Sequence, residues 1–311
     1  MKSIWTMGEM IVEIMRPRAE MPHGVCSEYL GPYPSGAPAI MISAAARMGA
    51  NAGIIGGVGK DAFGDMMINR LESFGVDCSL VHRSSEGSTG NAFVMYHNDG
   101  SREFIFHIDG TPAVSVPVPD VSNITDPAYF HIMGCSLTSS RDFCRRILET
   151  AKLFIDRGCK ISFDPNIRPE LLGSSDLEEI VEPVMENCSV LLPGVDELLL
   201  LSGKKAINAA VEKLFRRPKL ELIVLKNGSR GCTVYSREGH FSMPAYKVCQ
   251  KDATGAGDCF DGAFLAALIA GKDVKTAACE AGAAGALNAA AFGPMEGDIS
   301  PLTVEQMIKK G

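Results

Sequence analysis

Short apolar runs alternate with helix-patterned stretches through the second half of the chain. The apolar runs predict strands that are buried on both faces: Lys160–Phe163, Ser189–Leu192, Leu222–Leu225 and Cys232–Tyr235. Helical spacing and capping residues predict the helices between them, over 139–157, 176–187, 195–202 and 207–216. This alternation is typical of an α/β fold with a mostly parallel central sheet and covering helices.

The first third of the chain has a different pattern. Residues 90–97 and 102–107 flank the turn Asn98–Ser101, which has Asn and Gly where a positive φ is wanted, and this predicts a β-hairpin. With segments 10–15 and 26–33 the hairpin predicts a small strand-rich lid over an edge of the body. The alternative, that the hairpin only adds strands to the main sheet, stays open at this level.

No linker divides the chain. The Pro-rich piece 112–127 is typical of a long connection rather than of a domain boundary. We therefore expect one domain over 1–311, with a β-lid formed by segments near 10–33 and 90–108.

Composition narrows the class of partner. The 311 residues include 37 acidic and 30 basic ones, giving a formal charge of −7, and no Lys/Arg run occurs. This charge disfavours nucleic acid as a partner. No window approaches the ~20 apolar residues of a membrane span, so no membrane partner is expected. Ten cysteines without a C-x-x-C pair, and no signal-peptide core, indicate a cytoplasmic protein with reduced thiols.

The segment 251–268 carries the clearest chemistry. Gly255, Ala256 and Gly257 allow close approach to the backbone, and the free amides of the helix start form an anion hole. Asp258 in the same turn adds a base, so a hydroxyl could lose its proton there while the amides stabilise a migrating phosphoryl group. The plainer interpretation is a tight turn followed by an acidic residue favoured by the helix dipole. P-loop and protein-kinase motifs do not occur in the sequence.

Asp252–Phe264, with the letters DATGAGDCFDGAF, closely resembles the C-terminal signature of the ribokinase-like carbohydrate kinases of the phosphofructokinase-B type. Residues 35–64 are similar to the family's N-terminal sugar-side signature, and 164–169 to its D-P-N-x-R segment. The resemblance spans roughly the whole chain. It implies a Rossmann-like three-layer body with a β-lid, ATP-dependent phosphorylation of a sugar hydroxyl, Mg²⁺, and often homodimers through the lid.

The resemblance also implies catalytic and metal roles. Asp258 matches the general base, and residues 255–257 match the anion hole. Asp252 matches the position that holds a monovalent cation such as K⁺. Glu197 matches the Glu of the family's N-x-x-E magnesium element, although Gly194 replaces its Asn. Alternatively, Glu197 faces solvent, and the adjacent Asp196 could take its place.

Nucleotide contacts are implied in two places. Lys226-Asn-Gly-Ser-Arg-Gly231 stands where the family has T-x-G-x-x-G, so Lys226, Gly228 and Gly231 are expected in the nucleotide loop. Asn288 falls where the family lines the adenine pocket, but a buried helix amide explains this residue almost as well.

Substrate contacts are implied for Glu13, Gly36, Ala37, Asn166 and Arg168, which fall at hydroxyl-contacting or phosphate-facing positions. Polyol recognition needs several such groups, because an unmatched hydroxyl leaves buried polar atoms unpaired. Taken alone, Arg168 would more often be a structural salt-bridge residue.

Residues 6–15 and 31–40 are most similar to the corresponding segments of bacterial tagatose kinases, and next most similar to those of fructokinases. Ile40 replaces an Asn that many relatives carry, so one hydroxyl contact is expected to be missing. A 2-keto-3-deoxygluconate kinase needs a cation for the substrate carboxylate, and the lid end 106–109 has no Arg. Arg102, Arg168 or His107 could still reach a carboxylate. We therefore expect a neutral ketohexose, phosphorylated at a primary hydroxyl.

A binding protein is the remaining alternative. A sugar- or nucleotide-binding regulator could keep this fold and lose catalysis, and the Gly194 and Ile40 departures favour that weakly. The intact Asp258 and its anion hole favour the enzyme, because a pure binder gains nothing obvious from a carboxylate at the phosphoryl-transfer position.

Overall fold

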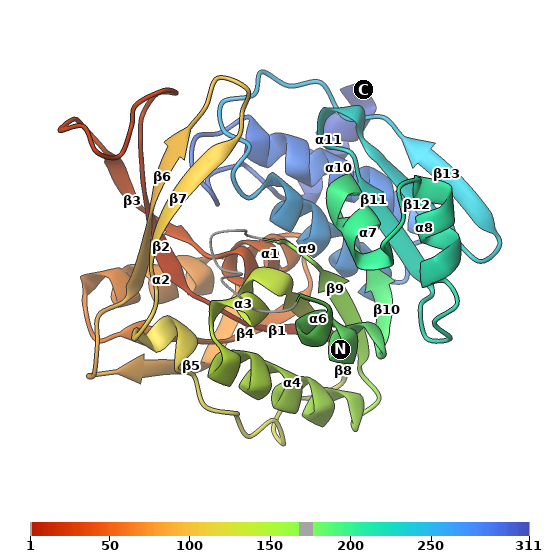
Figure 1. Cartoon of the computed structure of the whole chain (residues 1–311), viewed down its shortest axis with the longest axis horizontal. Coiled ribbons are helices and arrows are strands. Elements are labelled where there is room, and N and C mark those ends of the chain that lie inside the picture. The colour runs from red at the N-terminus through yellow and green to blue at the C-terminus, as the bar shows by residue number, and fades with distance from the viewer. Residues whose placement is uncertain (1, 168–176, 311) are drawn as a thin grey trace.

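The computed structural model describes residues 2–167 and 177–310. Within them a large sheet runs through the molecule in the order β13-β12-β11-β10-β9-β8-β1-β4-β5 (Figure 1). All neighbouring strands from β11 to β5 are parallel, and β12 and β13 are antiparallel additions. The strand bounds are β1 Ser3–Met7, β4 Asn51–Gly59, β5 Val76–Ser84, β8 Pro127–Met133, β9 Lys160–Asp164, β10 Cys188–Leu191, β11 Leu222–Lys226, β12 Cys232–Ser236 and β13 Gly239–Met243. The α/β prediction is confirmed.

Helices cover both faces of this sheet, giving three layers. Neighbouring residues of a strand point to opposite faces, and accordingly Ile54 and Ile55 belong to two different hydrophobic clusters. One cluster contains α1 Ala37–Arg47, α2 Ala62–Ser73, α9 Ala256–Ile269, α10 Val274–Ala289 and α11 Pro301–Lys310. The other contains α4 Arg141–Ile155, α6 Leu177–Met185, α7 Val195–Ser202 and α8 Ile207–Leu214. Shorter pieces are α3 Gly134–Ser139, η1 Pro112–Val114 and η2 Gly228–Arg230.

Capping residues set two of the helix starts. The helix predicted over 139–157 is preceded by a separate short helix, because the Ser140 side chain accepts a hydrogen bond from the Phe143 amide at 3.1 Å and caps α4 there. Helix α1 begins at Ala37. Gly36, at φ 104°, is its N-cap, and the following Pro38 is favoured in a first helical turn.

Four further strands form a second, smaller sheet in the order β3-β2-β6-β7. Their bounds are β2 Ile11–Met15, β3 Leu30–Ser35, β6 Gly90–Tyr96 and β7 Arg102–His107. The predicted hairpin is confirmed as the antiparallel pair β6–β7. The alternative, that these strands extend the main sheet, is wrong. In Figure 1 the small sheet stands beside the upper part of the body, next to the helices of the C-terminal third.

The segment predicted to be strand-rich over 26–33 is a strand only from Leu30 onward. The loop before it surrounds the fully buried Arg16, whose guanidinium donates to the carbonyls of Pro22 and Val25 at 2.7 Å. The same group donates to the Glu28 carbonyl at 3.1 Å and lies 3.8 Å from the centroid of the Tyr29 ring. These carbonyls bond a side chain instead of a neighbouring strand, so no strand forms there.

In the part of the chain that the structure describes, none of the helices has the length and apolar character of a membrane span.

Candidate active site

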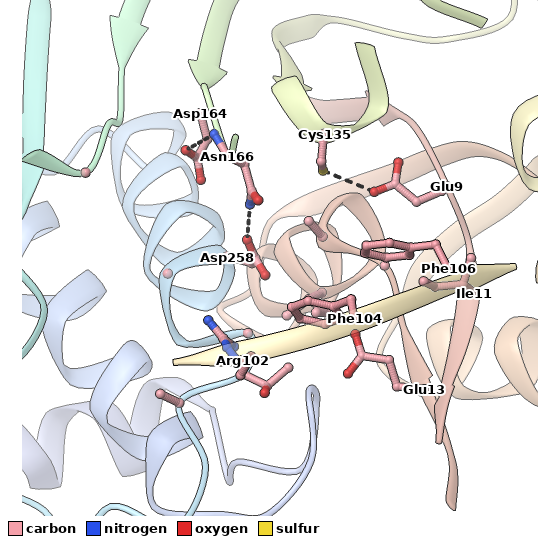
Figure 2. A pocket seen from close by; sticks show the side chains of 18 of the residues that line it. Glu9, Ile11, Glu13, Arg102, Phe104, Phe106, Cys135, Asp164, Asn166 and Asp258 are labelled. Carbon is pink, nitrogen blue, oxygen red and sulfur yellow. Dashed lines mark hydrogen bonds between the residues drawn. The ribbon is translucent and has the colours of Figure 1, made fainter. Parts of the chain in front are cut away.

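An open cavity of about 200 Å³ lies between the start of α9, the ends of β9 and β11, and the small sheet (Figure 2). It collects most of the residues singled out in the sequence: Glu13, Gly36, Ala37, Asn166, Glu197, Lys226, Gly255, Gly257 and Asp258. The carboxyl ends of parallel strands are the usual place for a ligand site in open α/β sheets. Segments far apart in the sequence therefore meet at one pocket.

Backbone geometry at the start of α9 suits an anion. Gly255 is the N-cap at φ 76°, and a Cβ built on it would lie 2.4 Å from the Pro294 carbonyl oxygen, so only glycine fits. The Ala256 amide donates to Ala253 at 3.2 Å. Among the described residues no hydrogen-bond partner is found for the amides of Gly255 and Gly257, and both residues line the cavity. These two amides are the better candidates for the anion hole, whereas Ala256 does not line the cavity.

Asp258 lies in the first turn of α9 and faces the cavity, with 7% of its surface exposed. Its Oδ1 accepts a hydrogen bond from the Asn166 Nδ2 at 3.0 Å. Asn166 has a left-handed backbone at φ 36°, which Asn tolerates better than most residues, and its amide donates to the Asp164 Oδ1 at 3.1 Å. Among the described residues the buried Asn166 Oδ1 has no hydrogen-bond partner, so it can accept a hydrogen bond from a ligand hydroxyl.

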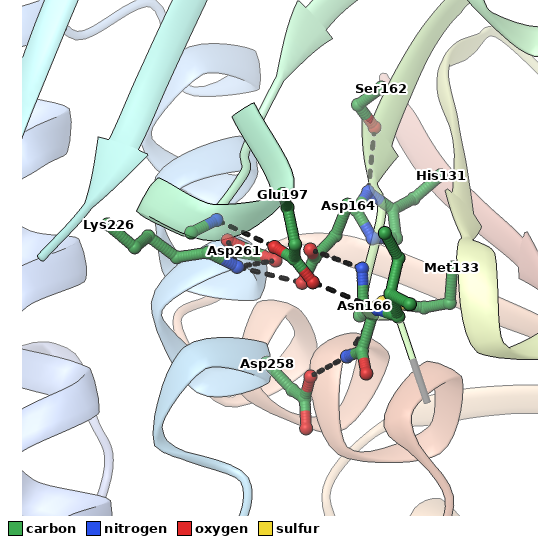
Figure 3. Close-up of polar contacts among 11 residues, drawn as sticks. His131, Met133, Ser162, Asp164, Asn166, Glu197, Lys226, Asp258 and Asp261 are labelled. Atoms are coloured by element: carbon green, nitrogen blue, oxygen red, sulfur yellow. Dashed lines mark hydrogen bonds and ion pairs between the residues drawn. The ribbon is translucent and has the colours of Figure 1, made fainter. Parts of the chain in front are cut away.

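Lys226 ends β11 with its ammonium between two carboxyl groups (Figure 3). Nζ donates to the Asp164 Oδ2 at 2.7 Å and to the Asp261 Oδ2 and Oδ1 at 2.9 and 3.1 Å. Its three N–H donors are thus matched by three carboxyl oxygens, and the nucleotide contact expected of Lys226 stays a prediction. Asp164 and Asp261 were not singled out from the sequence. The spacing of Asp258 and Asp261 on one helix face is the signal that could have found the second.

The charges of this cluster differ in sign and strength. Burial by itself lowers the pKa of Lys226, but the carboxyl groups of Asp164, Asp261 and Glu197 raise it well above its ordinary value, so the ammonium stays charged. Burial raises the pKa of Asp261 well above its usual range. For Asp164, burial is outweighed by Lys226, which lowers its pKa. Lys226 therefore favours the charged form of Asp164.

Glu197 faces the same cavity from α7. Its Oε2 accepts the Gly194 amide at 2.7 Å and its Oε1 the Ile167 amide at 2.9 Å. Burial, followed by the nearby Asp164, raises the pKa of Glu197. Of the two adjacent acids, Glu197 lines the cavity and Asp196 is exposed to solvent. The magnesium role of Glu197 stays a prediction. Carboxylate oxygens at a phosphate-binding cavity are groups that Mg²⁺ takes as ligands.

Asp252 and Asn288 hold the loop before α9. The Asp252 carboxylate accepts hydrogen bonds from the amide and hydroxyl of Thr254, from the Tyr96 hydroxyl and from the Gly293 amide, at 2.7 to 3.1 Å. Asn288, expected beside the adenine, is fully buried and donates to the Thr254 carbonyl at 2.8 Å. These contacts fit the buried-amide interpretation, and the adenine contact stays a prediction.

The small sheet forms the opposite wall of the cavity. Alternate residues of β7, namely Arg102, Phe104 and Phe106, face inward, and the two phenyl rings stack with centroids 5.2 Å apart. From β2, Glu13 accepts the Ser35 hydroxyl at 2.7 Å. Ile40 also lines the cavity, so the departure noted there falls within the site.

Sequence reasoning missed Glu9, which lines the cavity with only 6% of its surface exposed. Its carboxylate accepts hydrogen bonds from the Cys135 thiol at 3.1 Å and the Ser136 hydroxyl at 2.5 Å. The signal was a carboxylate placed shortly before β2 in an otherwise buried segment. Acidic residues are rarely fully buried unless they are paired, so an acid within an apolar segment is a candidate for ligand contact.

The two glycines of the expected nucleotide loop lie outside the cavity wall. Gly228 and Gly231 belong to the turn between β11 and β12, with φ of 56° and 92°, and neither lines the cavity. Arg168 lies outside the described residues.

The site combines a carboxylate at a helix start, two amides for which the described residues offer no hydrogen-bond partner, and a wall formed by a second sheet. This arrangement suits phosphoryl transfer to a hydroxyl. Comparison with known proteins agrees. Residues 1–300 match the pfkB family of carbohydrate kinases. Fructokinase-1 of Zea mays is 32% identical over 269 residues, 84% of this chain and 81% of that protein.

Two solved structures extend the likeness. An E. coli protein described as a ribokinase II, in complex with ATP and Mg²⁺, is 36% identical with a TM-score of 0.93, and covers 100% of both chains. A Vibrio cholerae O395 fructokinase variant with fructose, ADP and potassium bound is 25% identical with a TM-score of 0.87, covering 99% of this chain and 98% of that one. This chain belongs to the pfkB carbohydrate kinase family, and it is a sugar kinase with the ribokinase-like fold.

Proposed function

We propose that this protein transfers the γ-phosphoryl group of ATP to a primary hydroxyl of a neutral ketohexose, with fructose favoured over tagatose. The observation that carries the proposal is the placement of Asp258 on the cavity wall, between the free amides of α9 and the side chain of Asn166. The names of the relatives support fructose: Fructokinase-1 of Zea mays, and the Vibrio fructokinase variant with fructose bound.

Asp258 acts as the general base in this proposal. The sugar hydroxyl gives its proton to the carboxylate as its oxygen forms a bond to the γ-phosphorus, and ADP leaves with the electrons of the broken P–O bond. The amides of Gly255 and Gly257 stabilise the charge that gathers on the transferred group. Asn166 keeps the carboxylate turned toward the hydroxyl.

Cation roles follow from the donor sets. Glu197 would hold Mg²⁺, which neutralises phosphate charge when bound, together with water and the nucleotide's own oxygens. A monovalent cation beside Asp252 stays a prediction, supported by the potassium of the Vibrio structure. The described contacts already satisfy this carboxylate within the chain. The turn at Gly228 and Gly231 stays the predicted nucleotide loop.

The acids around the cavity support a neutral sugar. Glu9 and Glu13 line the sugar side, where their carboxyl groups accept hydrogen bonds from hydroxyl groups. Arg102 is the basic residue on the facing wall, and it alone would favour an acidic sugar such as 2-keto-3-deoxygluconate. On the described part of the sugar side, two acids against one guanidinium favour hydroxyl-rich, uncharged substrates.

A homodimer through the small sheet also stays a prediction. The exposed apolar side chains of Leu30 and Ile105 on that sheet support it. Molecular mass in solution tests this prediction.

The experiment is ADP release with Mg²⁺ATP and D-fructose, D-tagatose, ribose or 2-keto-3-deoxygluconate. We expect the highest kcat/KM with a ketohexose. Efficient turnover of the keto acid with none of a neutral sugar would overturn the substrate assignment. Nucleotide binding without turnover of any sugar would favour the silent regulator instead.

A further inference from the structure

Lys226 lines the cavity beside the catalytic residues, and two buried carboxyl groups bind its ammonium. Its ammonium is held by Asp164 at 2.7 Å and by both oxygens of Asp261 at 2.9 and 3.1 Å. Asp164 is 2% exposed and Asp261 is fully buried. An ammonium has three N–H donors, so a phosphate oxygen would have to displace one of these carboxyl groups.

Two chains of contacts lead from Lys226 to Asp258 (Figure 3). Through Asp164, the first passes to the Asn166 amide at 3.1 Å and from the Asn166 side chain to the Asp258 Oδ1 at 3.0 Å. Through Asp261, the second passes along α9, where Asp258 lies three residues earlier on the same helix face. One ammonium therefore holds both the helix that carries the base and the residue that orients it.

The same ammonium lies close to the anion hole. A Cβ built on Gly257 would lie 3.7 Å from the Lys226 Nζ. A fixed positive charge at this distance, largely shielded from water, adds to the field of the helix start where phosphoryl charge develops. The charge does so without contacting the phosphoryl group.

We propose that Lys226 is a positioning residue: by holding Asp164 and Asp261 it sets the geometry of Asp258 and Asn166, and it is not a ligand of the nucleotide. This inference rests on the sugar-kinase function. It assigns Lys226, the last residue of β11, a role other than the nucleotide contact that the family resemblance implies.

The test compares Lys226→Met with Lys160→Met as a matched control. Lys160 begins β9, which is separated from β11 by β10, and makes an exposed ion pair with Glu221 at 2.7 Å. For Lys226→Met we expect kcat to fall at least ~30-fold while the Kd of MgADP, measured by calorimetry, changes less than about threefold. The control should keep both values.

The double variant Lys226→Met/Asp261→Asn distinguishes a positioning role of Lys226 from a purely structural one. This double variant removes the cation together with one of its two carboxyl groups, so it should melt at a higher temperature than Lys226→Met. We expect its kcat to stay low, because Asp164 has still lost its fixed partner. Recovery of kcat to the wild-type level together with the melting temperature would overturn the positioning role, as would a single variant with wild-type kcat.

A tenfold or greater rise in the Kd of MgADP in either variant would make Lys226 a nucleotide ligand and overturn the inference. That measurement uses no sugar, so it is independent of the substrate assignment. Wild-type protein without turnover of any sugar in the panel would overturn the proposed function, whereas an active wild type with an equally active Lys226→Met variant would overturn this inference alone.

Discussion

The end of the cavity at α9 and the wall formed by β7 hold their side chains in different ways. At α9, a continuous series of hydrogen bonds runs from Asp258 through Asn166 and Asp164 to Lys226. At β7, Phe104 and Phe106 present stacked rings to the cavity. Hydrogen bonds have strict geometry, whereas apolar contact is non-directional. The first region suits chemistry that needs fixed atoms, and the second suits a surface that adapts to a substrate.

The largest difference is expected from Asp258→Asn, which keeps the shape of the side chain and removes the base. We predict a fall in kcat of at least ~10²-fold with nucleotide affinity retained, because general-base catalysis typically contributes that much. Steady-state kinetics and MgADP calorimetry measure the two effects. Asp142→Asn, at an exposed residue of α4, is the control. Near-normal turnover in Asp258→Asn would remove this residue as the base.

The second prediction tests how tightly the start of α9 is packed. Gly255 and Gly271 flank the same helix with φ of 76° and 79°, but only Gly255 has a backbone atom where a Cβ would go. Gly271→Ala should cost ~1 kcal/mol, from left-handed strain alone. Gly255→Ala should cost about 3 kcal/mol, since overpacking adds to the strain.

Urea unfolding measures both glycine variants. Equal losses of stability would show that the loop at Gly255 yields easily, and that the catalytic end is less rigid than its contacts indicate.

The third prediction concerns pH. His131, on β8 beside this cluster, has its pKa lowered by burial to about 3, and its Nδ1 lies 3.0 Å from the Ser162 hydroxyl. The unfolded chain takes up a proton near the ordinary pKa of about 6.5, whereas the folded protein does not. Stability is therefore highest above that pH and falls as the pH drops toward 3.

When the pH is lowered from 7 to 5, the free energy of unfolding of the wild type should fall by ~2 kcal/mol more than that of His131→Asn. Urea unfolding at the two pH values measures this difference. The same loss in both proteins would show that His131 is not held neutral in the folded state.

The smallest effect is expected at the β7 wall. Phe106→Leu should raise the sugar KM about fivefold with kcat unchanged, because the contact it removes is equally strong in the ground and transition states. Ile105→Leu, on the outward face of the same strand, is the matched control. A fall in kcat as large as that of Asp258→Asn would erase the contrast between the two regions.

The alternation of strands and helices, the β6–β7 hairpin and the helix start at Gly255–Asp258 could be predicted from the sequence, because local patterns encode them. Periodicity, turn residues and small residues at a helix start act over a few positions. The placement of Glu13 and Asn166 at one cavity was expected only through family resemblance. The structure brings both to the cavity that contains Asp258.

Tertiary structure alone decided which protein groups the ambiguous polar residues contact. Lys226 meets Asp164 and Asp261, which come from β9 and α9, and Asn288 meets the Thr254 carbonyl. The sequence alone placed neither set of partners. The three acceptors named here lie 34 to 62 residues away in the chain. Which acceptor a buried donor finds depends on how whole elements pack, and no local pattern encodes that packing.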